Sequence, residues 1–382
     1  AKKESLNWWG NRKQKIYGAD FLHKRKIGNL DLVIGGFLLE DEGYRFDETI
    51  SRKRFNFNTR YKNKKITGLS YGLNGNFLFN EVGSALIWKS YEEAYLPLGD
   101  AATLTSGDVF NIDPYITYIN IKNNDKHNLR TRYMKVVNDN STTDGEDANQ
   151  DNQSETYYAE YQYQKSIDGW KLNWTSGLMN ELVYAISDLF QGKNYRINNA
   201  AYTQFDKKFG QRLNLSAGAR YEHFSLHSEN LYEMSSGDST NFFSTSKPVF
   251  RAGANYQIGK ATFLRSSWGQ GYRFPSIAEL FIETEVAQSI YVFANPKLTP
   301  EEGWSSELAV KQGLQIGNWQ GFFDLAAFIM EYYNMMEFSF GQWAEPEGDN
   351  LGIGFKSVNV GDTQIIGLES SIAGKGKIGN LN

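Results

Sequence analysis

The sequence predicts an all-β protein, a transmembrane antiparallel up-and-down β-barrel. Three observations lead to this fold class: apolar side chains recur at every second position, aromatic residues make up 15% of the chain, and short connections alternate with long ones. A membrane barrel needs apolar residues only on its lipid-facing side, so its average composition stays polar while its aromatic content rises. A soluble β-sandwich or solenoid is the alternative fold.

Segments of about ten residues with two unlike faces recur along the chain, and about sixteen of them are candidate strands. Leu213, Leu215 and Tyr221 share one face of such a segment, whereas Arg212 and Arg220 belong to the other. A dry core could not hold so many charged and amide groups. We therefore expect the polar face to line a wet interior and the aromatic face to meet lipid. The same pattern occurs in the segments 55–61, 69–79, 157–163 and 250–258.

The connections between these segments fall into two classes by length. In membrane barrels the short turns lie at the periplasm and the long loops lie outside the cell. We expect the same separation here. The short connections include 207–211 and 258–260, and the long polar ones include 138–154, 225–247, 274–303 and 341–354.

Composition excludes several other classes of protein. The chain has 382 residues, no cysteine and a formal net charge of −4, which argues against disulfide scaffolds, thiol chemistry and nucleic-acid binding. The longest apolar stretch, 33–39, is far shorter than the roughly 20 residues of a membrane-spanning helix. No catalytic motif or cofactor fingerprint is found, so we expect neither an enzyme nor a bound cofactor.

A metal site is not expected either. His223 and His227 lie four residues apart on one face of a predicted strand, about 13 Å along it, which is too far to share a metal ion. The acidic stretch 138–151 does not have the ligand spacing of an EF-hand. We expect this stretch to form a solvated external loop.

Three motifs follow one another in the second half of the chain. The first contains Arg273, Phe274 and Pro275 and continues to Glu279, Leu280 and Phe281. Proline cannot donate to a sheet ladder, so prolines in these motifs are expected to end or bend strands and to serve the architecture rather than a ligand. The second motif consists of Asn295, Pro296, Lys297, Leu298, Thr299, Pro300 and Glu301, and the third runs from Asn359 to Gly367, Leu368 and Glu369.

Together these motifs resemble the sequence boxes of TonB-dependent outer-membrane receptors. The run 189–222 also resembles the Bacteroidetes-like branch of that family. The resemblance implies part of a 22-stranded barrel in the outer membrane, so that residues 1–382 form a barrel domain lacking its plug and C-terminal strands, with the plug upstream. It also implies a TonB energy-coupling partner acting through that plug. Arg220 and Glu369 are expected to face the lumen, where a plug docks.

The resemblance further implies active import of a scarce, bulky solute, with an iron–siderophore complex or a similar metal chelate as the leading ligand class. Cobalamin, haem, oligosaccharide and peptide remain open, although the interval 275–295 contains no histidine for haem. A passive porin or a surface-structural barrel without energy coupling is the alternative function. Aromatic residues in the predicted loops are the candidate ligand-binding residues: Tyr95, Tyr291, Phe293 and Trp343.

Overall fold

The computed structural model describes residues 8–10, 12–85, 88–98, 102–142, 150–190, 192–233, 239–287, 290–346 and 351–376. These ranges contain 17 strands, close to the number expected, one short α-helix and two 3₁₀ turns. No helix in them is long and apolar enough to span a membrane. The elements are β1 (Ile16–Ile27), β2 (Leu30–Asp41), β3 (Ile50–Lys62), β4 (Leu69–Ser84), β5 (Thr103–Asn120), β6 (Asp125–Thr142), β7 (Asn152–Ile167), η2 (Asp168–Trp170), β8 (Leu172–Ser187), η3 (Asp188–Phe190), β9 (Gly192–Phe209), β10 (Leu213–Glu233), β11 (Ser239–Gln257), β12 (Thr262–Arg273), α1 (Ile277–Phe281), β13 (Thr284–Ala287), β14 (Ile290–Phe293), β15 (Glu301–Ile316), β16 (Trp319–Gln342) and β17 (Ile353–Lys375).

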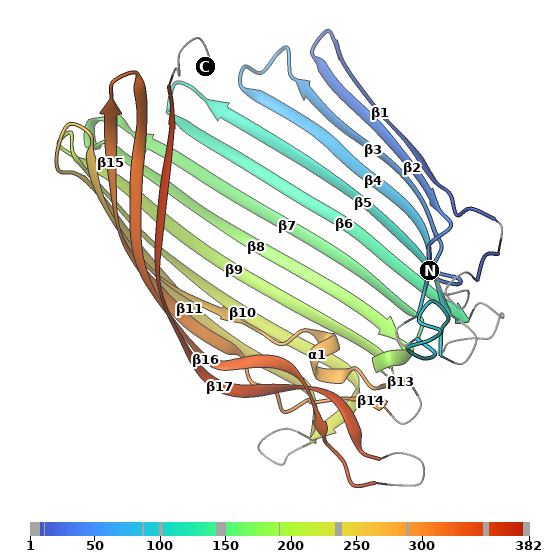
Figure 1. Ribbon diagram of the computed structural model, residues 1–382. Coiled ribbons are helices and arrows are strands. Elements are labelled where there is room, and N and C mark those ends of the chain that lie inside the picture. Colours follow the sequence, from blue (N-terminus) through green and yellow to red (C-terminus); the bar gives the residue numbers. More distant parts are fainter. Residues whose placement is uncertain are drawn as a thin grey trace.

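The strands form one curved wall in which each long strand pairs antiparallel with the next. The ladder runs from β1 to β12 and continues through β15, β16 and β17. The two four-residue strands β13 and β14 lie in the connection between β12 and β15, and β14 pairs parallel with the start of β17. Figure 1 shows the long strands tilted around an open, barrel-like interior, with α1, β13 and β14 at one end.

The two ends of the wall differ as the connection lengths predicted. Two-residue turns such as 28–29 and 317–318 close one end, whereas the connection that contains α1 lies at the other. Two expected loops are wrong in extent. Most of 225–247 is strand, because β10 continues to Glu233 and β11 starts at Ser239, and 138–142 of the expected loop 138–154 belong to β6, while 143–149 lie outside the described residues. Where a strand extends beyond the hydrocarbon layer, both of its faces contact water or protein. The alternation of apolar and polar residues is therefore lost there, although the ladder of backbone hydrogen bonds continues.

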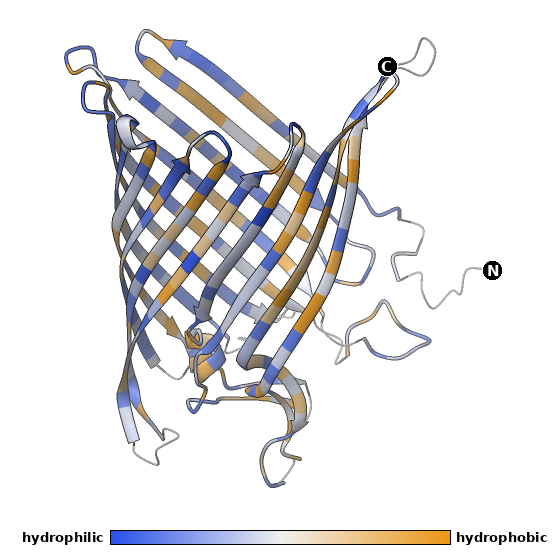
Figure 2. Cartoon of the chain, turned by 90° about the vertical axis from the view of Figure 1, so that its left-hand side faces the viewer, coloured by the Kyte–Doolittle hydropathy of each residue, from blue (hydrophilic) through white to orange (hydrophobic). Residues whose placement is uncertain are grey.

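The outward face of the wall carries the apolar side chains. On β10, Leu215 and Tyr221 point outward and Tyr221 keeps 54% of its surface exposed. Arg220 lies on the opposite face and donates from Nε to Glu222 at 2.7 Å. In the described ranges all strands belong to a single sheet, without the second layer that a β-sandwich requires. Figure 2 shows the resulting alternation of hydrophobic and hydrophilic residues along the strands.

Aromatic rings form a ladder across the outward face from β3 to β11. Neighbouring rings lie 4.4–6.3 Å apart, the usual range for aromatic pairs. A second group lies nearer the short turns, where Trp174 stacks on Phe205. On β9, Tyr195 and Phe205 are ten residues apart, about 33 Å of strand and about 25 Å of height at a tilt of about 40°, which matches the apolar band of a membrane barrel. The ladder consists of Phe55, Phe77, Phe110, Tyr133, Tyr157, Tyr184, Tyr195, His227 and Phe242.

At the end with the long connections, the wall turns inward. The ladder between β11 and β12 stops at the pair Arg251–Gly269. Beyond it the chain crosses the inner side of β11, so that Lys247 forms an ion pair with Glu302 of β15. The chain then reaches β10, where Phe274 stacks on Phe224 with ring centroids 4.2 Å apart. The connection after β12 therefore folds into the mouth of the barrel.

Candidate functional site

The first motif forms a capped helical turn inside the mouth. The Ser276 hydroxyl accepts a hydrogen bond from the Glu279 backbone N–H at 3.1 Å, and the Ser276 N–H donates to the Glu279 carboxylate at 2.8 Å, which makes a capping box. Arg273 donates to both carboxylate oxygens of Glu279, at 2.7 and 2.9 Å. Burial raises the pKa of the Glu279 carboxyl, but the hydrogen bonds from Ser276 and Arg273 outweigh it and hold the pKa below its usual value.

The second motif ties this turn to the neighbouring strands. The Asn295 N–H donates to the carbonyl of Leu280 in α1 at 2.8 Å, and its side-chain amide donates to the carbonyl of Ser357 in β17, also at 2.8 Å. Pro300 precedes the first residue of β15, a position where a missing N–H costs no ladder bond. Glu301 accepts from the Met336 N–H at 3.1 Å and lies 3.5 Å from Arg273. The second motif is thus a joint between α1, β15 and β17.

Asn359, at the head of the third motif, holds a bend in the last two strands. Its amide donates to the carbonyl of Asn334 at 2.7 Å and to that of Thr299 at 3.1 Å. Asn334 has a positive φ of 54°, a conformation that asparagine tolerates better than most residues, and the β16–β17 register shifts at this point. The bend carries the ends of both strands across the mouth, where Figure 1 shows them turning.

Further along β17, the third motif reaches the inner side of the wall. Gly367 leaves room for the ring of Phe328, because a Cβ there would lie 2.3 Å from a ring atom. Glu369 pairs with Ala326 on the inward side of β16, two residues from Asp324, which binds Arg265 across the interior face. Arg220 and Glu369 both face the lumen, as expected from the alternation.

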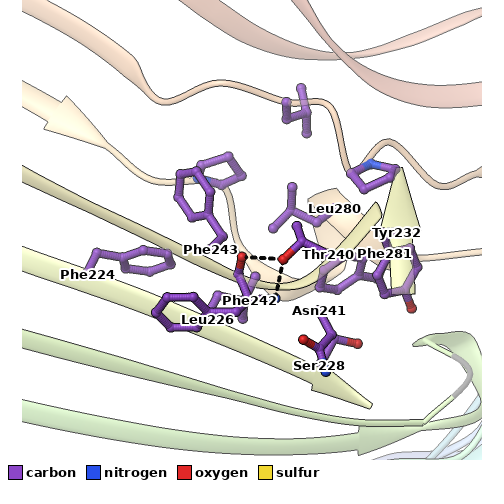
Figure 3. A pocket seen from close by; sticks show the side chains of 13 residues that line it. Phe224, Leu226, Ser228, Tyr232, Thr240, Asn241, Phe242, Phe243, Leu280 and Phe281 are labelled. Carbon is purple, nitrogen blue, oxygen red and sulfur yellow. Dashed lines mark hydrogen bonds between the residues drawn. The ribbon is translucent and has the colours of Figure 1, made fainter. Parts of the chain in front are cut away.

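An apolar cluster fixes the folded-in connection against β10. Leu280 and Phe281 of α1 and Leu298 of the second motif are at least 94% buried and pack with Phe224 and Leu226. The cavity among these side chains measures about 30 Å³, room for about one water molecule and not for a ligand. Figure 3 shows how closely the side chains surround it. The geometry agrees with an architectural role of these motifs.

Sequence reasoning missed Phe224 and Leu226, although a signal was present. Along β10 the inward positions from Asn214 to Glu222 are polar or glycine, and they become apolar at Phe224 and Leu226. An apolar pair on the wet face of a barrel strand requires a cover. Here the cover is α1.

Three of the four candidate ligand-binding aromatics lie together. The Trp343 indole donates to the carbonyl of Gly354 at 3.0 Å, and β14, which contains Tyr291 and Phe293, pairs with the same stretch of β17. A Cβ at Gly354 would lie 1.9 Å from the Tyr291 carbonyl oxygen, so this approach requires glycine. Trp343 therefore lies at the rim of the mouth next to β14, which is itself part of the folded-in connection.

Tyr95 is separate from that group. It lies in the connection between β4 and β5, where its ring contacts Tyr44 at 5.6 Å and stacks on Trp9 at 6.4 Å. Trp8 joins the same cluster through Phe46 at 5.2 Å. The strand order therefore gives the mouth two aromatic groups, one beside β4–β5 and one beside β16–β17.

Below the mouth, the inner wall is polar and half-buried. Arg132 binds Asp113 through two hydrogen bonds of 2.7 and 2.8 Å, and Arg196 binds Glu181 at 2.7 Å. These pairs line a recess of about 810 Å³. Such a recess can hold a polar solute or a protein segment, and two of its arginines are neutralised by carboxylates of the wall.

Glu160 occupies the centre of this surface. It accepts from Tyr202 at 2.7 Å and from Tyr158 at 3.1 Å. Part of this network was visible in the sequence as the polar positions between the tyrosines of β7. The pairing of Glu160 with Tyr202 was not, because it spans 42 residues and depends on the sheet register.

Comparison with known proteins adds a decisive observation. A family model described as TonB dependent receptor-like, beta-barrel, matches residues 9–381. The chain belongs to this family of TonB-dependent receptors. Like other members, this receptor lies in the outer membrane and crosses it with strands. The family consists of receptors and transporters and not of enzymes.

Solved structures with the same fold are receptors of this kind. The hemophore receptor HasR of Serratia marcescens, solved with its hemophore and heme, has a TM-score of 0.69 and 12% identity; the match covers 98% of this chain and 63% of that chain. The siderophore receptor PirA of Pseudomonas aeruginosa has a TM-score of 0.70 and 11% identity over 94% of this chain and 60% of its own.

A third structure, the ferric yersiniabactin uptake receptor FyuA of Yersinia pestis, has a TM-score of 0.64 and 12% identity over 94% of this chain and 56% of its own. This receptor chain thus spans less than two thirds of the length of each of the three structures. No curated protein matches its sequence. The Bacteroidetes-like affinity of the run 189–222 stays a prediction.

Proposed function

We propose that the protein is the barrel of an outer-membrane receptor for TonB-coupled active import of a scarce, bulky solute. The leading ligand class is an iron–siderophore complex or a similar metal chelate. The observation that carries the proposal is the family match over residues 9–381. Structural neighbours named as siderophore, heme and copper receptors or transporters support the ligand class.

The polar recess of the inner wall is the second support. A polar recess that carries paired charges stays solvated and can receive a plug, as plugged membrane barrels do. In this proposal residues 1–382 are the barrel domain, the plug is encoded upstream, and TonB pulls on that plug. The ligand contacts the mouth at Trp343, Tyr291 and Phe293, with Tyr95 on the other side.

The test is growth of the host bacterium under iron limitation on single defined ferric chelates, with and without the gene. We expect growth on at least one chelate to require both the gene and TonB. Indifference to every iron chelate would remove the siderophore class while leaving the receptor fold untouched. Stable open conductance of the full-length protein in planar bilayers would instead favour the passive porin.

A further inference from the structure

A groove crosses the outward face of the wall near the short turns. It has a volume of about 500 Å³ and a mostly apolar lining. Its floor is Leu215 and Ala217 of β10 with Ala252 and Ala254 of β11, and bulkier side chains border it on both sides. The flanking strands β9 and β12 are three strand spacings apart, about 14 Å, which accommodates two hydrocarbon chains side by side. The bordering side chains are Leu172, Phe205, Phe209 and Trp268.

Positive charge lies at the short-turn end of this groove. Lys207 lines the groove itself, and its ammonium is 5.2 Å from the Phe209 ring centroid and 5.9 Å from that of Trp170. Lys171 donates to the carbonyl of Gly210 in the adjacent turn at 3.3 Å. Across the ranges that the structure describes, neither lysine has an ion-pair partner. The carboxylate of this turn, Asp168, accepts from Asn124 at 2.6 Å.

The other turns on the short-turn rim are also mainly basic. Its seven turns contain a single acidic residue, Asp168, whereas acidic residues predominate in the long connections at the other end. A basic rim attracts anionic headgroups, and each lysine near an anionic membrane surface raises the preference for anionic lipid about fivefold. The basic residues of the turns are Lys64, Lys65, Lys122, Lys171, Arg212 and Lys260.

We propose that this groove is a binding site for an anionic glycerophospholipid of the periplasmic leaflet. The short turns of an outer-membrane barrel lie at the periplasm, so the groove faces the acyl chains of that leaflet and Lys171 and Lys207 lie at the level of its phosphates. The two acyl chains occupy the floor between Phe205 and Trp268. The lipid phosphate bridges the two ammonium groups, while the rings of Trp170 and Phe209 hold the Lys207 ammonium at the interface.

The test uses the full-length receptor in nanodiscs containing phosphatidylethanolamine with one fifth phosphatidylglycerol, and native mass spectrometry to count the lipids that stay bound. The wild type is expected to retain phosphatidylglycerol preferentially. Replacing both lysines (K171N and K207Q) should reduce that preference about 30-fold. Lys171 has a positive φ of 47°, so asparagine suits the backbone there and the double variant keeps the fold.

Two controls separate a site from general attraction. Lys208 follows Lys207 but lies on the lumen face of β9, away from the lipid, so K208Q changes the net charge by the same amount and should leave the preference unchanged. Ala252→Phe fills the exposed groove floor without altering charge and should abolish retention. Equal retention of both lipids by the wild type, or an equal loss in K208Q and in the double variant, would overturn the proposal.

Discussion

Removal of the Phe224 ring should release the connection 274–300 from the barrel mouth. Phe224 is 2% exposed and stacks on Phe274, and it lies beneath Leu280 and Phe281 of α1. Truncation of a fully buried phenylalanine costs about 3–5 kcal/mol. Because a small cavity already lies beside it and the connection can settle into the space, we expect about 3 kcal/mol here, which raises the opening constant of the connection about 150-fold.

Hydrogen exchange measured by mass spectrometry on the full-length protein in nanodiscs reports this opening directly. The peptides covering α1 and the second motif should lose protection in Phe224→Ala, while those from the middle of β5 and β6 should not change. Phe250→Ala is the matched control, since Phe250 is 50% exposed on the outward face of the neighbouring strand. Unchanged exchange in 274–300 would show that the apolar cluster does not hold the connection, and the reasoning would be refuted.

Ser276→Ala removes the helix cap and should destabilise α1 by about 1 kcal/mol, visible as roughly fivefold faster exchange of its amides. Because the folded-state pKa of Glu279 is lowered, its contribution should be complete at neutral pH and fade as the pH falls below about 4.5; an equally steep pH dependence of α1 exchange in Glu279→Gln would contradict this. Gly354→Ala places a methyl group against the Tyr291 carbonyl and should detach β14 from β17, which a disulfide trap between the two strands would detect as lost cross-linking. Trp343→Ala should weaken binding of the transported chelate at least tenfold in a fluorescence titration, whereas an unchanged affinity would remove Trp343 from the ligand site.

The sequence was sufficient for the fold class because alternation is a local property. Tyr221 and Arg220 are neighbours with opposite environments, and their order alone predicted which would face lipid. The residue at which a ladder of hydrogen bonds between two strands ends is not determined by the local sequence. The inward turn after Gly269 depends on Lys247 meeting Glu302, 55 residues away, and on Phe274 finding Phe224. The separation of Tyr95 from Trp343 likewise follows from strand order, which residue type does not reveal.

The geometry of the mouth also explains why the three motifs have the residue types they do. Each motif supplies a different part of one inward-folded joint: Arg273 and Glu279 close the first turn, Asn295 links it to β17, and Asn359 holds the bend in β16. The motif side chains that do line a cavity surround one that holds about one water molecule: Pro275, Leu280, Phe281, Pro296 and Leu298. We therefore expect the joint to set the shape of the mouth and the choice of ligand to depend on rim side chains such as Trp343, whose surroundings are not part of any motif. On this argument, exchange of the rim connections between receptors should transfer specificity, whereas exchange of motif residues should only damage the mouth.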